Sequence, residues 1–330
     1  MQRALARAGA RAVKHAARAA LALLALHAGM AAAQYPHKAV RVVVSTVPGP
    51  LDAFVRLVME QVSASLKQPF VVENKPGAGG NLAAEYVKSQ AADGYTLLFA
   101  IDTTFTVNPG LFKGKLPFDP VKDFAAIAVP VTFGQMLTVG PDVPAKTTAE
   151  LVALAKRKPM TYASGGNGSP SHLAAAYFFS TAGVEMTHVP YKGTGQSVID
   201  VLGGRVDALF AVTNGVLPYV KDGRLRALAV SSAQRSALAP DVPTVAELGY
   251  PGFDVTFAYA LMAPAGTSDE IVQLLAREVR KALEVPEMRE KLRLADYRVT
   301  GLDSKASAAW IVTAREKWNR VIEKTGISPE

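Results

Sequence analysis

The sequence predicts an α/β protein of two lobes, each with a β-sheet covered by helices. Two observations lead to this expectation. Short apolar, β-branched segments alternate with amphipathic ones in a repeated strand–loop–helix order, and the order starts again at Met136. The 330 residues also fit two domains of roughly 100–200 residues each. The repeated order by itself predicts parallel sheets with helices on both faces.

Composition excludes several classes of protein. Hydrophobic residues make up 49% and charged residues 19% of the chain, which excludes disorder and low complexity. The absence of cysteine excludes a disulfide framework, thiolate catalysis and cysteine-ligated zinc. No apolar stretch after the first thirty-odd residues is long enough to cross a bilayer. We therefore expect a protein that is not embedded in a membrane.

Residues 1–33 have the three regions of a secretory signal peptide. Met1–Arg18 is basic, Ala19–Leu26 is a short apolar run, and Ala31–Ala33 is a small-residue cleavage signature. We expect export to the periplasm with cleavage after Ala33, although an amphipathic transit peptide or a short anchor would share some of these features. Without the five basic residues of this leader, the formal net charge falls from +8 to +3. The remainder has no basic run or aromatic stripe, so nucleic acid is not an expected partner.

The apolar pattern places the elements of each block. In the first block the expected strands are Val40–Val44, Phe70–Val72 and Thr96–Ile101, with helices over 51–66 and from Leu82. In the second block the expected strands are Met136–Val139, Tyr162–Ala163, His188–Val189, Ala208–Val212, Leu225–Val230 and Val255–Met262, with helices Thr148–Ala155, Ser171–Ala182 and Ser197–Leu202. Thr147 or Thr148 caps the first of these helices.

The tail of the chain is helical. The expected helices are Glu270–Leu283, Pro286–Ala295 and Lys305–Lys324. If they return to pack on the first lobe, two strands form the hinge. Residues 34–135 and 257–330 then make lobe 1, and residues 136–256 make lobe 2.

Three glycine-containing loops share one context. Val47–Leu51, Gly77–Asn81 and Gly165–Ser171 each follow a strand and open a helix. Such loops lie at the carboxyl ends of the strands, where ligands collect in open α/β sheets. Helix N-termini favour anions there because their amide hydrogens are unpaired. The simpler interpretation of each loop is a tight turn that needs a positive φ. None of them has the P-loop or dinucleotide-binding pattern.

The sequence gives little support to catalysis. No zinc-protease or nucleophile-elbow motif and no carboxylate cluster with metal spacing is present. Asp52, Asp102 and Asp207 are able to reach a cleft, although a first-turn acid, a loop acid and a turn acid are the more ordinary interpretations. No metal and no cofactor is expected, and we expect the protein not to be an enzyme.

Several segments carry a resemblance to a known family. They are Tyr35-Pro36, Asp52 with Arg56, Val72–Gly80, Asp93–Leu98, Ser164–Ser169 with His172, His188–Gly193, Gly203-Gly204 with Asp207, and Asp241–Thr244 with Glu247 and Gly249. Together they resemble the Bug family, the periplasmic solute receptors of tripartite tricarboxylate transporters. The runs Asn74–Gly80 and Pro190–Gly193 are the most specific of them.

The resemblance implies a Venus-flytrap receptor with a mixed sheet in each lobe and a two-strand hinge. It implies that the lobes close on a small organic carboxylate and that membrane transporter subunits receive it. The matching ligand-binding positions are Gly49 and Asp52 in the first loop, Gly79 and Gly80 in the second, and Gly168 and Ser169 in the opposite lobe, with Tyr191, Lys192, Gly193 and Asp207 as further candidates. Asp102 is a further candidate, as an acid able to reach a cleft.

The chain departs from the family pattern at Pro48. The family usually has a glycine pair in this loop, and Pro48 replaces one glycine and removes an amide donor. The hydroxyls of Ser45 or Thr46 are candidates to compensate. We therefore expect a ligand that differs from a plain dicarboxylate. The lysines at 75 and 192 are the cationic residues of these loops, and solvated loop lysines are the simpler interpretation.

Two other functions are compatible with an exported ligand-binding protein. One is a sensor that presents its ligand to a membrane kinase, which would differ only in the docking surface. The other is an exported enzyme that acts on a carboxylated substrate with acid–base help from His188 or Asp207. The missing catalytic constellation argues against the enzyme.

Overall fold

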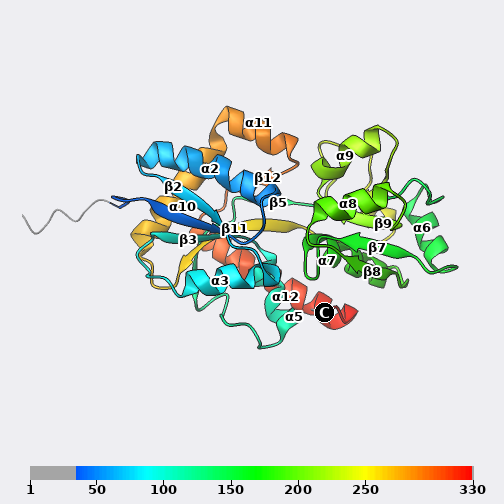
Figure 1. Cartoon of the computed structure of the whole chain (residues 1–330), viewed down its shortest axis with the longest axis horizontal. Helices are drawn as coiled ribbons and strands as arrows, with labels where there is room; N and C mark the ends of the chain where they lie inside the picture. The colour runs from blue at the N-terminus through cyan, green and yellow to red at the C-terminus, as the bar shows by residue number, and fades with distance from the viewer. Residues whose placement is uncertain (1–34, 329–330) are drawn as a thin grey trace, which may run out of the picture. The chain divides into compact units, whose positions relative to one another are not determined.

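The computed structural model describes residues 35–328. The chain divides into two compact units, Met1–Ala39 and Val40–Glu330. In the first unit, the described residues 35–39 contain no helix or strand. The expected signal peptide, residues 1–33, lies outside the described residues. Everything below concerns the second unit, which carries two β-sheets (Figure 1).

The first sheet combines parallel and antiparallel strands. Its strands are, in spatial order, β12 (Arg298–Val299), β5 (Val131–Phe133), β11 (Phe257–Pro264), β3 (Thr96–Ile101), β1 (Val40–Val44) and β2 (Phe70–Asn74), with β4 (Phe124–Ala128) also paired to β11. The strands β1, β2 and β3 run parallel, as predicted. The strand β11 runs antiparallel to β3, β4 and β5.

The second sheet is also mixed. Its strands are, in order, β10 (Arg226–Val230), β6 (Met136–Val139), β9 (Ala208–Ala211), β7 (Thr161–Ser164) and β8 (Thr187–Pro190). The strand β7 is parallel to β8 and β9, whereas β6 is antiparallel to β9 and β10. The prediction of parallel sheets was therefore wrong, and the mixed sheets implied by the family resemblance are confirmed. In each sheet, the strand that follows a crossing from the other sheet is antiparallel to its neighbours. This strand is β11 in the first sheet and β6 in the second.

Helices cover both faces of the first sheet. The helix α2 (Pro50–Leu66) places Phe54 against Phe99 of β3, with ring centroids 5.8 Å apart. The helix α3 (Asn81–Lys88) packs Ala83 and Val87 around Val43 of β1 on the opposite face. The tail helices α10 (Asp269–Glu284) and α12 (Ser304–Thr325) pack against β4. Alternation of side chains along a strand produces these two apolar layers.

The second sheet is covered in the same way. Phe210 of β9 packs edge-on against Phe178 of α7 (Pro170–Thr181), with centroids 6.0 Å apart. The neighbouring Leu209 belongs instead to a cluster with Val198 and Val201 of α8 (Thr194–Leu202). The predicted helix α6 (Thr148–Ala155) is confirmed with both bounds. Its N-cap is Thr147, whose hydroxyl accepts a hydrogen bond from the Glu150 amide at 3.2 Å.

Some elements have no clear sequence signal. They are α4 (Thr103–Thr106), α5 (Asn108–Phe112), α9 (Thr213–Lys221), β4, β5, β12 and the 3₁₀ turns η1 (Ala78–Gly80) and η2 (Ala246–Leu248). The short helices span too few residues to show a 3.6-residue period. The helix α9 contains Gly215 and Pro218, which predict a break rather than a helix. The helix α11 (Pro286–Leu294) lies within its predicted range.

In the described residues, the chain passes between the two sheets at residues 134–135 and 255–256. Ser231 joins these two segments. Its hydroxyl accepts a hydrogen bond from the Gln135 amide at 2.8 Å and donates one to the Val255 carbonyl at 2.6 Å. Its own amide and carbonyl bond to the same two residues. Because Ser231 is fully buried, these bonds fix the two crossing segments side by side.

Candidate functional site

Three loops of the first sheet leave from one edge. The register pairs Val44 of β1 with Asn74 of β2 and with Phe99 of β3. Because the strands are parallel, their carboxyl ends meet at this edge, and the loops that follow them lie together. Two of these loops are the first two glycine loops of the sequence. The third begins at Asp102 and forms α4.

Gly80 brings these three loops into close contact. Its φ is +94°, and a Cβ atom built there would lie 2.3 Å from Thr104 Oγ1 and 3.3 Å from the Cβ of Ser45. Only glycine fits this backbone conformation and this approach. The Thr104 hydroxyl also donates a hydrogen bond to the carbonyl of Gly79 at 3.2 Å. Ser45, Gly79 and Gly80 therefore lie together, as the sequence predicted for the first lobe, and Thr104 joins them.

Asn108 stands at the point where the two lobes approach each other. It is 2% exposed, and its Nδ2 donates to the Gly79 carbonyl at 3.0 Å and to Asn81 Oδ1 at 2.6 Å. Gly168 of the second lobe lies opposite. A Cβ atom on Gly168 would be 3.3 Å from Leu111 Cδ1 and 3.8 Å from Asn108 Oδ1. The second and third glycine loops therefore face the same asparagine from opposite lobes.

The third glycine loop uses much of its own hydrogen-bonding capacity. The amide donors are Gly165 to Ser171 Oγ (2.9 Å), Gly166 to Ser164 Oγ (3.1 Å), Gly168 to His172 Nδ1 (3.1 Å) and Ser169 to the Gly166 carbonyl (3.1 Å). The Ser169 hydroxyl caps α7 by accepting from the His172 amide at 3.3 Å. Within the described residues, the amides of Asn167 and Ser171 have no acceptor. These two amides are the free donors of this loop.

A stack of rings supports this loop. His172 and His188 stack with centroids 4.0 Å apart and an interplanar angle of 5°, and Tyr162 stacks on His188 at 4.9 Å. His188 Nε2 shares a hydrogen bond of 2.6 Å with Ser164 Oγ. Burial lowers the pKa of His172 to about 3 and that of His188 to about 4. Both rings are therefore neutral near pH 7, and Nδ1 of His172 is free to accept the Gly168 amide hydrogen.

Asp52 forms an ion pair at the start of α2. Its carboxylate accepts two hydrogen bonds from Arg56, at 2.9 and 3.0 Å, and these hold its pKa below the usual range. Arg56 also donates to Asn74 Oδ1 at 3.3 Å. The pair itself carries no net charge. The amides of Leu51 and Asp52, in the first turn of α2, have no acceptor among the described residues.

These loops are therefore suited to an anion held by neutral donors. Free amides occur at the first turns of α2 and α7, where the helix dipole is positive. Such donors avoid the desolvation of a second buried charge. A separate hollow of about 420 Å³ lies away from these loops, with an apolar floor of Ala276, Val279 and Leu283 from α10. It receives no residue of the glycine loops.

Comparison with known proteins identifies the family. Residues 54–327 match the family described as "Tripartite tricarboxylate transporter family receptor". The UPF0065 protein in the gbd 5′ region of Cupriavidus necator is 38% identical over 322 residues, covering 97% of each chain. This chain belongs to the tripartite tricarboxylate transporter receptor family. It is thus a solute-binding receptor of the Bug type, in a family of periplasmic binding proteins, and not an enzyme.

Two solved relatives of the receptor contain ligands. The R. palustris protein Rpa4515, solved with adipate, is 30% identical, with a TM-score of 0.83 over 90% of this chain and 100% of its own. MatC (Rpa3494) from Rhodopseudomonas palustris, with bound malate, is also 30% identical, with a TM-score of 0.80 over 87% of this chain and 100% of its own. The two-lobed fold predicted for the receptor is confirmed by this similarity.

The side chains of two predicted residues, Asp102 and Asp207, are already engaged within the fold. Asp102 is fully buried, and its carboxylate accepts hydrogen bonds from the Ala258 amide at 2.9 Å and from Thr106 Oγ1 at 3.2 Å. Asp207 accepts from the amide and hydroxyl of Thr161, at 2.7 and 2.9 Å. Asp102 follows β3, at the same edge as the first-lobe loops, whereas Asp207 precedes the amino end of β9, at the opposite edge from Ser164–Ser171. Asp102 joins β3 to β11 and Asp207 joins β9 to β7, so both have structural contacts in place of a ligand.

The remaining candidates lie near the loops with defined contacts. Gly193 precedes α8 and lies beside Gly165. A Cβ atom built on Gly165 would be 3.6 Å from the carbonyl carbon of Gly193. The Tyr191 hydroxyl donates to Asp200 at 2.6 Å, so it is already engaged. The carbonyls of Thr46 and Gly49 accept from Asn74 Nδ2 at 3.0 Å and from the Ala53 amide at 2.9 Å, respectively.

Sequence reasoning missed Thr104, Asn108 and Asn81. Asn81 directly follows the glycine run, and Asn108 precedes Pro109, a common helix start. These local signals indicate turns, but they do not reveal that the two asparagines bond to each other. Of the loop lysines, Lys75 is exposed, and its Nζ lies 4.5 Å from the ring centroid of Tyr86. Among the described residues, no helix has the length and apolarity needed to cross a membrane, and no three potential metal ligands cluster.

Proposed function

We propose that this receptor captures a small organic carboxylate between its lobes and delivers it to the membrane subunits of a tripartite tricarboxylate transporter. The observation that carries the proposal is the meeting of glycine loops from both lobes at Asn108, within a family whose solved members include an adipate and a malate complex. The neutral donors around that point suit a carboxylate.

The proposed ligand contacts are made by the carboxyl-end loops. From the first lobe they include Ser45, Thr46, Gly49, Asp52, Gly79 and Gly80, and from the second lobe Gly168, Ser169, Tyr191 and Gly193. To these we add Asn108 and the free amides of Leu51, Asn167 and Ser171. The Asp52–Arg56 pair would orient the first turn of α2 toward one carboxylate. Lobe closure would then add the contacts of the second lobe, so that ligand shifts an open–closed equilibrium.

A thermal-shift screen of the mature protein tests this function. Malate, adipate, monocarboxylates, aromatic acids and amino acids are compared, with the dimethyl ester of each active diacid as an uncharged control. A ligand at about 100 times its dissociation constant stabilises the fold by about 2.7 kcal/mol. We expect a shift with at least one acid and none with its ester. No shift with any acid, or turnover of one, would overturn the receptor proposal.

Pro48 bears on which acid is bound. It supplies no amide hydrogen to the first loop, where the family usually has glycine. We therefore propose that the receptor binds one carboxylate group of its ligand strongly, and that it does not bind two carboxylate groups equally. A monocarboxylate or a substituted acid that stabilises more than malate and adipate supports this. Equal or stronger stabilisation by the plain dicarboxylates contradicts it.

We also propose that export removes residues 1–33, so that the mature chain begins at Gln34. N-terminal sequencing of the exported protein tests this, and a start at Met1 contradicts it. The proposed lobes are residues 34–135 with 257–330, and residues 136–256. The change of sheet at residues 134–135 and 255–256 supports these bounds.

A further inference from the structure

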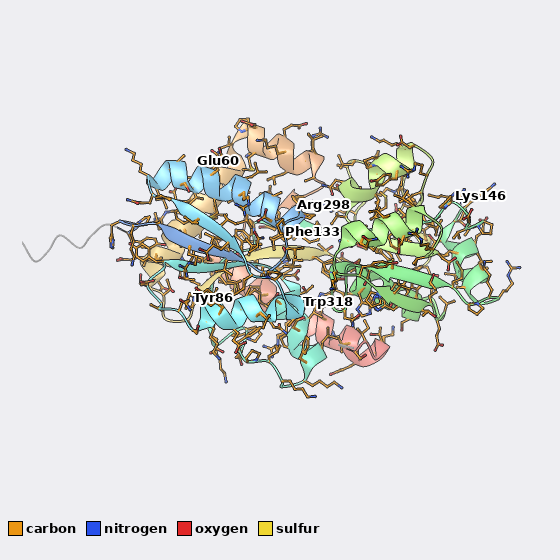
Figure 2. The ribbon with its side chains drawn as sticks, in the orientation of Figure 1. Glu60, Tyr86, Phe133, Lys146, Arg298 and Trp318 are labelled. Atoms are coloured by element: carbon orange, nitrogen blue, oxygen red, sulfur yellow. The ribbon has the colours of Figure 1, made fainter. Side chains whose placement is uncertain are left out.

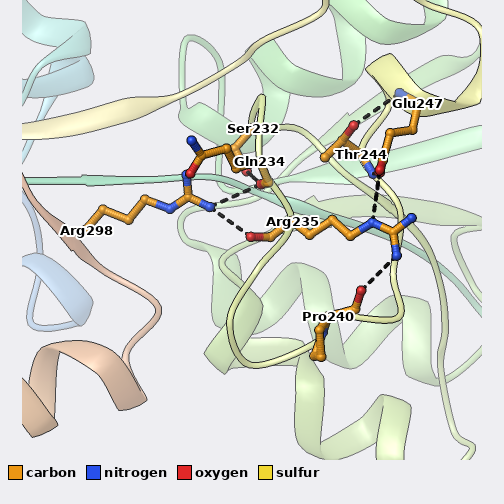
Figure 3. Close-up of polar contacts among 7 residues, drawn as sticks. All are labelled: Ser232, Gln234, Arg235, Pro240, Thr244, Glu247 and Arg298. Atoms are coloured by element: carbon orange, nitrogen blue, oxygen red, sulfur yellow. Dashed lines mark hydrogen bonds and ion pairs between the residues drawn. The ribbon is translucent and has the colours of Figure 1, made fainter.

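Arg298 reaches from the first lobe to the second. Its guanidinium donates to Gln234 Oε1 at 2.8 Å, to the Gln234 carbonyl at 3.2 Å and to the Arg235 carbonyl at 2.8 Å (Figure 3). Arg298 lies in β12 of the first sheet, and both acceptor residues follow β10 of the second. One guanidinium nitrogen, Nη2, donates to the two adjacent carbonyls, and Nη1 donates to the Gln234 side chain. A lysine ammonium cannot reproduce this planar arrangement of donors.

The first-lobe end of this contact is fixed. The backbone of Arg298 pairs with Thr132 of β5. The preceding residue, Tyr297, packs edge-on against Phe54 of α2 with centroids 5.8 Å apart, and its hydroxyl shares a hydrogen bond of 2.9 Å with Tyr259 of β11. Since β5 and β11 are the strands that lead into the crossing segments, Arg298 extends from the base of the hinge.

The second-lobe end is fixed as well. Ser232 Oγ donates to the Gln234 carbonyl at 2.8 Å. Arg235 Nε donates to both carboxylate oxygens of Glu247, at 2.9 and 3.2 Å, and Nη1 donates to the Pro240 carbonyl at 2.9 Å. These bonds hold the acceptor loop to its own lobe (Figure 3). Because the backbone at each end is tied to its own lobe, a large change in the angle between the lobes would stretch the Arg298 bonds.

The contact also lies next to the crossing segments. A Cβ atom on Gly134 would be 2.9 Å from Ser232 Oγ, so the acceptor loop begins directly beside residues 134–135. No acidic side chain pairs with Arg298 among the described residues, so its three bonds all go to neutral oxygens of the other lobe. The contact is thus built between lobes and is separate from the glycine loops.

We propose that Arg298 is a latch that holds the two lobes in the approach seen here before any ligand arrives. It is a positioning residue, because it touches no part of the proposed ligand site. By favouring the approached state, it reduces the free energy that ligand must supply to bring the third glycine loop to Asn108. The consequence for affinity rests on the proposed function, whereas the latch itself is independent of any ligand.

Distance measurement between spin labels tests the latch directly. The chain has no cysteine, so Glu60→Cys on α2 and Lys146→Cys near α6 provide a unique pair of labels on exposed residues of different lobes (Figure 2). Without ligand, we expect Arg298→Ala to broaden the distance distribution and move its maximum. The matched control is Arg293→Ala, which removes the same charge from an exposed intrahelical pair with Glu290. An Arg298→Ala distribution equal to that of the control overturns the proposal.

Further variants separate the latch from general stability. Gln234→Ala keeps both carbonyl acceptors, so we expect a smaller change than with Arg298→Ala. Arg298→Lys loses the planar arrangement of donors and is expected to be intermediate. Circular dichroism and unfolding curves check that each variant is folded, and Arg298→Gln replaces Arg298→Ala if that variant is not. A Gln234→Ala change as large as that of Arg298→Ala contradicts the assignment to the carbonyls.

The effect on binding is measured with the acid that stabilises the wild-type protein in the thermal-shift screen. We expect Arg298→Ala to weaken its affinity about tenfold, through three lost hydrogen bonds of a charged donor. Unchanged affinity with an altered distance distribution would overturn the link to ligand capture. If no acid binds, the proposed function fails, and the distance measurement still decides the latch.

Discussion

Replacing Gly80 by alanine should disturb the site much more than replacing its neighbour Gly79. Both residues have positive φ, +94° and +63°, so alanine incurs left-handed backbone strain of about 1 kcal/mol at either position. At Gly79 the nearest atom to a new Cβ is Asn108 Nδ2 at 3.4 Å, an ordinary contact. At Gly80 the new Cβ would meet Thr104 Oγ1 at 2.3 Å.

The collision at Gly80 has further consequences. Thr104 is 1% exposed and cannot turn away without losing its hydrogen bond to the Gly79 carbonyl. That bond is worth about 1 kcal/mol, and overpacking adds roughly 1–3 kcal/mol. We therefore expect Gly80→Ala to lower the free energy of unfolding by about 3–5 kcal/mol, against about 1 kcal/mol for Gly79→Ala.

Denaturant unfolding of both variants measures this difference. The double variant Gly80→Ala with Thr104→Ala removes the colliding oxygen, so it should recover part of the lost stability. Titration with the active acid should show the same order, because Gly80 sets the position of the second loop. Equal effects of the two glycine substitutions, or no recovery in the double variant, would refute the steric argument.

Two other predictions concern buried titratable groups. Burial raises the pKa of Asp102 to about 7 from 3.8, so the folded state holds a proton that the unfolded chain releases, and wild-type stability falls as the pH rises between these values. Asp102→Asn removes this dependence. The unfolding free energy of the variant relative to that of the wild type should therefore rise by up to about 4 kcal/mol from pH 4 to pH 8. A difference that stays constant with pH would contradict the raised pKa of Asp102. His172→Phe leaves the Gly168 amide without its acceptor and should lower stability at pH 7 by about 1–3 kcal/mol. Since the folded pKa of His172 is about 3 against 6.5 in the unfolded chain, wild-type stability falls as the pH drops below 6.5, and the variant should lose less in the same unfolding series.

Much of the secondary structure follows from short-range pattern. The bounds of Val40–Val44, Thr96–Ile101 and Met136–Val139 are as predicted, because buried strands are continuous apolar runs. The helix α9 was missed because Gly215 and Pro218 interrupt its pattern, and tertiary packing of its apolar residues overrides their low propensity.

The sequence alone determined the α/β class, the glycine loops at strand ends and, through family motifs, the type of receptor. Only the tertiary structure decided the direction of β11, the burial of Asp102 and the bonds of Asn108 to both asparagine and glycine partners. Periodicity and turn residues act between neighbours along the chain. Strand direction and hydrogen-bond partners depend on segments more than a hundred residues apart, such as Asp102 and Ala258, which meet only when the sheets form.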